Sequence, residues 1–456
     1  MKGYRLFLKT KAELGHANIQ YLLGEAYYLG NYDFGTDDEE ALRWFRLSAE
    51  QGEENAMYAF AEHILQSDEK EPAIPKAVRL LKAAIKAENY FAAYRLGIFY
   101  LDAEGENFDR KQGVKYLRLA ARNDQAEAQT RLGELYQGGH HVRQNLKTAM
   151  AWYQKAADQE DGLAMLRLGL CYEFGRGVEI NPKKAFEFYE SASENGNSYA
   201  DLRIGLCRRY GKGCDEDDQI AFEKFTEAAE YEIEEAQYWL GICRFYGEGI
   251  PQNYGEALAH FEIASASDPE AYYWIGLLKR KGLGCRKDLN FAFECFLKAA
   301  EQGFTPAINA LGRAFYFGEG ISEDYGEAVK WLKLAVEEND DDAMYLLGMC
   351  YLEGDGVAED EKYGLKLLED SALFGNGAAK KSLTEMGFTL PEEVKNEGNL
   401  FEVGNELLKL SRIAYQKITA SRDIDKQKQE VGRLIKFPFG RAGSVDQAMR
   451  EFSDTK

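Results

Sequence analysis

A two-residue signature, Leu-Gly or a close variant, recurs along this 456-residue chain at nearly constant spacing. Its ten copies are separated by 37, 36, 36, 36, 36, 36, 35, 36 and 36 residues. The second residue of each copy is Gly24, Ala61, Gly97, Gly133, Gly169, Gly205, Gly241, Gly276, Gly312 or Gly348. A period between about 20 and 50 residues is typical of proteins built from stacked structural repeats. The periodicity therefore constrains the fold more tightly than any single motif.

Further signatures keep the same register. A small residue stands five positions before the signature glycine in most copies, namely at Ala92, Ala128, Ala164, Ala200, Ala236, Ala271, Ala307 and Ala343. An aromatic residue often follows three positions after the glycine, as at Tyr27, Tyr100, Tyr136, Tyr172, Phe315 and Tyr351. A turn with two glycines two residues apart comes next, as at Gly175 and Gly177. These positions predict one helix, a glycine turn and a second helix in every copy.

The spacing has a physical reason. On a helix that turns 100° per residue, the alanine, the leucine and the aromatic residue fall on one face. The glycine lets a neighbouring helix approach closely, and the turn glycines supply the positive φ that a helix end requires. Two amphipathic helices cannot bury their apolar faces alone, whereas stacked pairs form one continuous core. We expect ten such repeats between about Gly15 and Asn376.

This pattern resembles the Sel-one-like repeat (SLR) family, the relatives of tetratricopeptide repeats that have longer turns. The resemblance covers about 360 of 456 residues. It implies an all-α fold, a right-handed α–α superhelix (solenoid) of about ten 36-residue two-helix repeats with a C-terminal helical tail. It also implies protein binding on a concave surface lined by the first helices, and no catalysis. The second repeat departs most, because Phe60-Ala61 replaces Leu-Gly and Pro72 and Pro75 interrupt its turn.

The same register predicts three segments. We expect an N-terminal lead-in at residues 1–14, an SLR solenoid with a closing helix at 15–387, and a C-terminal helical extension at 388–456. The extension lacks the repeat signature, but its apolar positions predict an amphipathic helix. These positions are Leu400, Phe401, Leu407, Leu408, Tyr415 and Ile418. The extension either docks on the solenoid or binds a partner, and the sequence leaves both alternatives open.

Charge and cysteine content limit the partners and the location. The chain has 77 acidic and 56 basic residues and a net charge of −21. Nucleic acids and anionic membranes carry phosphate charge, so we expect neither as a partner. No secretory signal and no apolar run of about 20 residues is found. The odd number of cysteines, seven, does not suggest a disulfide framework. Cytoplasmic residence is the resulting expectation.

No catalytic, metal-binding or cofactor-binding motif stands out. The seven cysteines occupy positions set by the repeat and are interpreted as small packing residues. They are Cys171, Cys207, Cys214, Cys243, Cys285, Cys295 and Cys350. The pair His140-His141 lacks further ligands at a suitable spacing, and the Gly-x-Gly turns follow no strand and lack the Lys-Ser/Thr of a phosphate loop. The chain is therefore not expected to be an enzyme, to hold a metal or to need a cofactor.

A partner face is predicted by helical-wheel arithmetic. Positions three before, one after and four after the signature glycine lie about 150° from the core stripe. On this face, or beside it, aromatic residues and arginines gather in the later repeats, a composition typical of interface hot spots. The predicted partner-binding residues are Tyr238, Tyr273, Phe245, Arg209, Arg280, Arg313 and Tyr316. The alternative interpretation of these seven residues is that they link one repeat to the next. That linking role is the one expected for a ladder of arginines two positions before the glycine, at Arg95, Arg131, Arg167 and Arg203.

Two classes of function agree with these features. The first is a cytoplasmic scaffold or adaptor that holds a protein or peptide with an acidic or carboxylate group in its concave face. The second is an inhibitor or immunity-type protein whose acidic surface blocks a basic partner. In the first class the partner contributes an acidic group, and in the second class the partner is basic.

Overall fold

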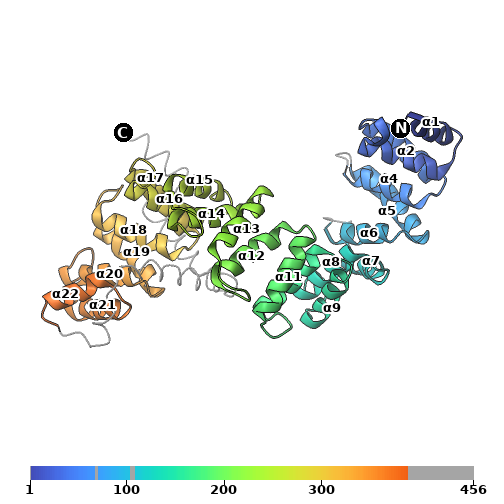
Figure 1. The fold of residues 1–456 in the computed structure, drawn as a ribbon. Helices are drawn as coiled ribbons and strands as arrows, with labels where there is room; N and C mark the ends of the chain where they lie inside the picture. Colours follow the sequence, from blue (N-terminus) through green and yellow to red (C-terminus); the bar gives the residue numbers. More distant parts are fainter. Residues whose placement is uncertain (1, 67–69, 103–107, 389–456) are drawn as a thin grey trace. The chain divides into compact units, whose positions relative to one another are not determined.

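The computed structural model describes residues 2–66, 70–102 and 108–388, and the regular structure there is helical (Figure 1). Part of the predicted C-terminal extension, from residue 389, lies outside the described residues. The helices are α1 (Lys2–Glu13), α2 (Ala17–Leu29), α3 (Asp38–Glu50), α4 (Glu54–Gln66), α5 (Lys70–Lys86), α6 (Tyr90–Asp102), α7 (Arg110–Arg122), α8 (Ala126–Gly138), α9 (Leu146–Ala157), α10 (Gly162–Phe174), α11 (Pro182–Glu194), α12 (Ser198–Tyr210), α13 (Asp218–Glu230), α14 (Glu234–Tyr246), α15 (Tyr254–Ala264), α16 (Glu270–Lys281), α17 (Leu289–Glu301), α18 (Thr305–Phe317), α19 (Tyr325–Glu337), α20 (Asp341–Glu353), α21 (Glu361–Leu373) and α22 (Gly377–Glu385). A short 3₁₀ helix, η1 (Asn31–Asp33), follows α2.

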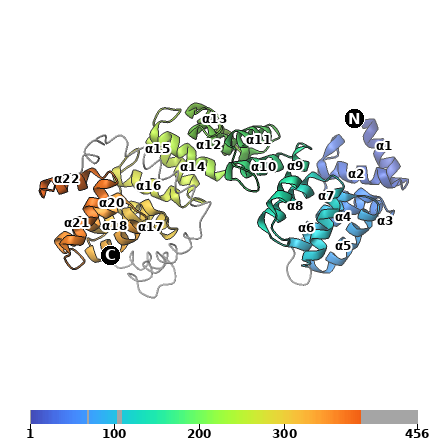
Figure 2. The same ribbon diagram turned by 90° about the horizontal axis from the view of Figure 1, so that it is seen from below.

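The chain divides into two compact parts, an N-terminal part, Met1–Asp217, and a C-terminal part, Asp218–Lys456. Within each part, helices that follow one another in the chain pack side by side, as both views show (Figures 1 and 2). The most extensive contacts join the two helices of one repeat, for example α6 with α7 and α20 with α21. Helix α1 packs on α2 and helix α22 on α21, so each covers an end of the stack.

The predicted all-α repeat fold is confirmed, with helix pairs running from α2–α3 to α20–α21. All eight alanines five positions before the signature are fully buried. The signature glycine allows the close approach expected of it: a Cβ on Gly169 would lie 2.4 Å from the ring of Tyr189, and one on Gly133 would lie 2.4 Å from that of Tyr153. Any larger residue there would overlap a buried ring.

The expectation for the second repeat is partly wrong. Its proline pair does not interrupt the turn, because α5 already begins at Lys70 and contains both Pro72 and Pro75. Helix α5 has 17 residues, whereas α3 and α7 have 13. Pro72 stands in the first turn of α5, where the N–H groups have no intrahelical partner, whereas Pro75 lies inside the helix. The divergent repeat therefore keeps its two-helix form by extending its second helix toward the N-terminus.

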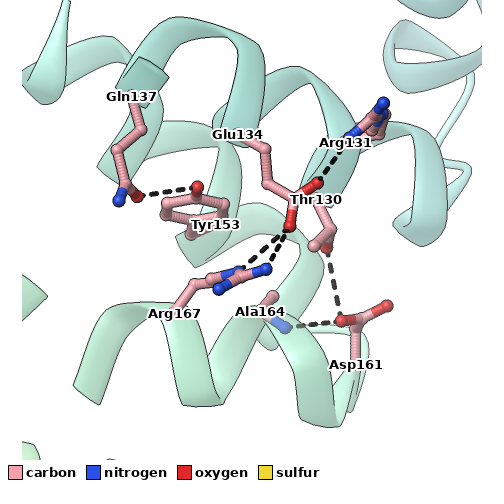
Figure 3. A network of polar contacts seen from close by, with 8 residues as sticks. All are labelled: Thr130, Arg131, Glu134, Gln137, Tyr153, Asp161, Ala164 and Arg167. Atoms are coloured by element: carbon pink, nitrogen blue, oxygen red, sulfur yellow. Dashed lines mark hydrogen bonds and ion pairs between the residues drawn. The ribbon is translucent and has the colours of Figure 1, made fainter. Parts of the chain in front are cut away.

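The arginine ladder links successive repeats, as the sequence predicts. Arg167 Nη2 lies 2.6 Å from Glu134 Oε1 of the preceding repeat, and Arg131 Nη1 lies 3.1 Å from the other oxygen of Glu134 (Figure 3). Arg95 pairs with Glu62 at 2.7 Å, and Arg203 pairs with Glu173. The pairs made by Arg95, Arg167 and Arg203 join first helices 30 or more residues apart in sequence. Arg131 and Glu134 lie on the same helix, and Arg131 reaches the preceding repeat through Asp102 at 3.6 Å. The ladder is thus structural.

A second polar link crosses the same junction. Asp161, the N-cap of α10, accepts a hydrogen bond from the Ala164 N–H at 2.6 Å. The hydroxyl of Thr130, on α8, donates to the same carboxyl oxygen at 3.3 Å (Figure 3). An N-cap aspartate satisfies a helix-start N–H that would otherwise lack a partner. Here it also ties the new repeat to the one before it.

The cysteines are free thiols, and five of the seven are buried, which confirms their packing role. Cys214 and Cys285, in the turns, are only partly buried. Burial raises the pKa of the Cys207, Cys295 and Cys350 thiols to about 12. The thiolate is the reactive form, so these three are held in an inert state.

We expect native protein to react with Ellman's reagent in two kinetic classes. Cys214 and Cys285 should react first, because their side chains are partly exposed, and the five buried thiols should follow only on unfolding. Denaturant should release all seven at once. In the variant C207A/C243A, Cys214 and Cys285 should still be the two cysteines that react fast. Fast modification of more than two cysteines in this variant would contradict the burial of the other thiols. A disulfide in freshly purified protein would contradict it as well.

Candidate partner-binding site

The structure distributes the seven predicted partner-binding residues unevenly. Six lie in the C-terminal part on α14, α16 and α18, whereas Arg209 lies on α12 in the N-terminal part. Arg209 and Tyr238 are buried, with 4% and 6% of their surface exposed. The expectation that both belong to an open face is therefore wrong. The reason is that a first helix contacts neighbouring repeats as well as its own second helix, so the face opposite the core stripe is partly covered.

Trp274, which the sequence analysis overlooked, joins the aromatic residues of this set. Its indole Nε1 donates to the Tyr238 hydroxyl at 3.1 Å. Its ring makes edge-to-face contacts with Phe245 at 5.1 Å and with Tyr273 at 5.5 Å between centroids. Trp274 stands two residues before Gly276, the register position of the arginine ladder. The sequence did contain a signal for this contact. Trp274 occupies the position that holds an arginine in the ladder, which indicates an apolar contact between repeats instead of an ion pair.

A carboxyl group lies at the buried end of these aromatic residues. The Tyr238 hydroxyl is 3.5 Å from Glu270 Oε2. Burial, followed by the nearby charge of Asp268, raises the pKa of Glu270 to about 8. At neutral pH this carboxyl is accordingly mostly protonated, and a hydrogen-bonded neutral acid can be buried at low cost. Tyr238 thus belongs to the interior of the stack, and Glu270 is partly buried beside it.

Positive charge concentrates at Arg280 and Arg313, which with Lys281 and Glu319 we call the arginine cluster. Arg280 Nη1 and Arg313 Nε lie 3.8 Å and 3.7 Å from the same oxygen, Glu319 Oε2. That oxygen accepts no hydrogen bond within the described residues, so the contacts are between charges only. The Arg313 side chain is 45% exposed and that of Arg280 is 21% exposed. One carboxylate therefore faces two accessible guanidinium groups.

The pKa shifts in the arginine cluster reflect this crowding. Burial, and then the charge of Arg313, lowers the pKa of Arg280. Burial lowers the pKa of Lys281 as well, and both arginines lower it further. Like charges held together destabilise their charged forms. An anion placed among these groups would relieve the repulsion.

The nearby aspartates are engaged elsewhere. Asp340 Oδ1 accepts from Asn309 Nδ2 at 2.9 Å and from the Ala343 N–H at 2.8 Å, and burial raises its pKa to about 7. Asp342 Oδ1 accepts from Asn376 Nδ2 at 2.7 Å. Neither forms an ion pair with Arg280 or Arg313 within the described residues. The arginine cluster keeps an excess of positive charge in an acidic chain.

Aromatic rings surround the arginine cluster. The guanidinium of Arg280 lies 5.7 Å from the ring centroid of Phe296, and that of Arg313 lies 4.9 Å from that of Phe317. Tyr316 is partly buried and contacts Phe317 edge to face at 4.8 Å. Cation–π contacts of this kind hold a guanidinium in place at little cost in conformational freedom. Arginine held among aromatic side chains is the composition of an interface hot spot.

Two other kinds of functional feature to consider in the described residues are a metal site and a membrane-spanning helix. They contain no group of three or more His, Cys, Asp or Glu side chains placed to hold a metal ion. Among the helices described, none is both long enough and apolar enough to cross a bilayer.

Comparison with protein families returns the Sel1 repeat in nine segments that together cover more than half of the chain. The matched residues are 18–53, 91–125, 126–161, 162–197, 198–230, 234–268, 269–304, 305–340 and 341–373. The gap between the first two matches coincides with the divergent second repeat, where the structure nevertheless contains the pair α4–α5.

Solved structures include a similar chain from uropathogenic Escherichia coli, c5321, described as a protective antigen with an SLR fold. It is 27% identical, the comparison covers 99% of this chain and 97% of that one, and the TM-score is 0.72. A Sel1 repeat protein from Oxalobacter formigenes is 28% identical over 68% of this chain and 89% of its own, with a TM-score of 0.48. No curated protein matches.

Proposed function

Because this chain belongs to the Sel1 repeat family, we propose that it is a non-enzymatic scaffold or adaptor that binds a protein or peptide partner. Repeats of this family generally mediate protein–protein interaction and are typically not enzymatic. The proposed binding surface is the face lined by the first helices of the later repeats, the concave face of such a solenoid. This assignment keeps Arg280, Arg313, Tyr316, Tyr273 and Phe245 as binding residues.

One observation carries the proposal: two accessible arginines share a single carboxylate in a chain of net charge −21. Local positive potential in an acidic molecule steers an anionic group to that place, and the surrounding rings supply contact area. The partner accordingly presents an acidic side chain, a carboxy terminus or a phosphorylated segment. Arg209 and Tyr238 act in this proposal only by holding repeats together.

The compartment and the excluded partners are part of the same proposal. Free thiols in all seven cysteines suit a reducing compartment, so we place the protein in the cytoplasm. Its acidity argues against nucleic acid and anionic membrane as partners.

The second candidate is an inhibitor or immunity-type protein that blocks a basic partner with its acidic surface, favoured by the net charge of −21. Salt separates the two candidates, because charge contacts spread over an exposed surface are screened whereas contacts among buried rings persist. Partners captured from a lysate at 50 mM salt should remain bound at 500 mM if the arginine cluster and its aromatic rings hold them. Complete release of a basic partner at 500 mM would favour acidic blocking instead.

A further inference from the structure

A basic pocket lies in the N-terminal part, between α7 and the turn that joins α8 to α9. Its volume is about 710 Å³. It is lined by Arg110, Lys111, Val114, Arg118, Tyr136, His141, Val142, Arg143, Gln144 and Asn145. Val114 is buried, whereas Arg110, Lys111 and Arg143 are exposed. Pockets between about 300 and 1,000 Å³ are of the size that holds a small molecule.

The charged side chains that line the pocket are all positive. Four lining residues are cationic, and none of the residues that line it is acidic. Arg110, Lys111, Arg118 and Arg143 form no ion pair with any carboxylate in the part of the chain that the structure describes. Helix α7 carries five basic side chains and no acidic one, in a chain of net charge −21.

Two of these cations lie at a helix end that favours anions. Arg110 and Lys111 are the first two residues of α7, where the helix dipole is positive. Acidic side chains are the ones that such an end stabilises, and α7 has none in its first turn. The N-cap Asp109, whose side chain accepts from the Lys111 and Gln112 N–H groups, offsets part of this charge.

The pocket lies where one repeat differs from the common repeat pattern. Eight residues after the signature glycine, the last six repeats carry a second turn glycine, at Gly177, Gly213, Gly249, Gly284, Gly320 and Gly356. A Cβ on any of these would lie 2.0–2.7 Å from an atom at the start of the preceding repeat's second helix. Those turns therefore close directly onto that helix.

In the fourth repeat this position is His141, in the left-handed conformation with φ 64°. The helix start that this turn faces is the first turn of α7, at Arg110 and Lys111. A histidine cannot approach as closely as the glycines do, because its Cβ would overlap the backbone. The turn stands off from α7, and the space left between them is the pocket.

Two side chains that line the pocket, Arg118 and Gln144, are held by hydrogen bonds. Arg118 Nη2 donates to the Tyr136 hydroxyl oxygen at 2.9 Å, which orients the guanidinium. Tyr136 makes no other hydrogen bond through its hydroxyl in the described residues, so its O–H can donate to a ligand. Gln144 Nε2 donates to the Gln137 carbonyl at 2.8 Å and holds the turn. His141 rests against Phe108, with 5.8 Å between ring centroids.

We infer that this pocket binds a small phosphorylated molecule. Guanidinium groups match phosphate oxygens in a two-pronged geometry, and several cations with a tyrosine donor suit a group that carries two charges and several acceptor oxygens. The assignment concerns a site in the N-terminal part and does not rest on the proposed partner binding. Loss of either activity leaves the other intact.

Isothermal titration of the full chain with pyrophosphate tests the site. We expect one-site binding, weakened at least about tenfold in the double variant Arg118→Gln/Arg143→Gln, which removes two charge-assisted hydrogen bonds. The matched control is Arg122→Gln, since Arg122 is an exposed cation of α7 outside the pocket. Equal weakening by the control, or citrate binding as tightly as pyrophosphate, would overturn the assignment.

A second variant tests how the pocket arises. His141→Gly restores the residue of the last six repeats, so the turn should close onto α7. We expect an unchanged or higher Tm together with at least tenfold weaker pyrophosphate binding. Full pyrophosphate affinity in this variant contradicts the proposal. So does a phosphoserine peptide that binds tenfold more tightly than pyrophosphate, because the ligand would then be a protein segment.

Discussion

Replacing Arg280 and Arg313 together with glutamate is expected to weaken binding of the native partner by about 100-fold or more. The substitution removes the two accessible cations of the arginine cluster and adds two negative charges beside Glu319. An anionic group that was attracted is then repelled, so the loss exceeds that of simple truncation. Surface plasmon resonance with the captured partner measures the change, and circular dichroism checks that the helical content is retained.

The control for this prediction is Arg43→Glu/Arg46→Glu. Both arginines lie on α3, their side chains are 61% exposed, and their ion pairs are local pairs on one helix. Exposed pairs of this kind contribute little to stability, and the control changes the net charge by the same amount. Binding should stay within about threefold of the native value. A control that loses affinity as strongly as the double variant would refute a localised site and favour a general effect of charge.

Replacing Gly169 with valine should destabilise the protein by about 3 kcal/mol or more. The added side chain has no room, because a Cβ at this position already lies 2.4 Å from the ring of Tyr189, which is fully buried. The Tyr189 hydroxyl also donates to Glu173, the partner of Arg203 in the ladder. Displacing the ring therefore disturbs a junction between repeats as well as the core. The measurement is the first transition in thermal unfolding followed by circular dichroism.

Gly377→Val provides the comparison for this variant. Gly377 is the first residue of α22, and a Cβ there would contact nothing within 4 Å. We expect a change within about 0.5 kcal/mol, as for most exposed substitutions. Similar losses in both variants would mean that valine acts through helix propensity, and close packing of the signature glycine would no longer be the explanation.

The register of the repeats was enough to predict the fold and its internal packing. The register placed the eight buried alanines, the signature glycines that press against aromatic rings, and the arginine ladder. Each of these depends on contacts inside one repeat or on the same contact made again 36 residues later. A periodic pattern in the chain is enough to predict a contact that is itself periodic.

The candidate site was predicted less completely. Helical-wheel arithmetic identified Arg280, Arg313 and Tyr316, but it also included Arg209 and Tyr238, which are buried. It overlooked Trp274, whose ring connects Tyr238, Phe245 and Tyr273. A helical wheel describes one helix against one partner. In the stack, each first helix also meets the helices of neighbouring repeats.

Tertiary contacts control which residues of the outer face remain accessible and where a pocket forms. The basic composition of α7 and the histidine at position 141 were both readable in the sequence, yet Lys111, in the first turn of α7, and His141 are 30 residues apart along the chain. Their combination depends on how closely a turn approaches the preceding helix, a distance set by steric contact between repeats. The exposure of a side chain depends on two neighbouring repeats together, and the sequence of one repeat does not reveal it. A residue that departs from the repeat pattern therefore shows its effect only in the packed structure.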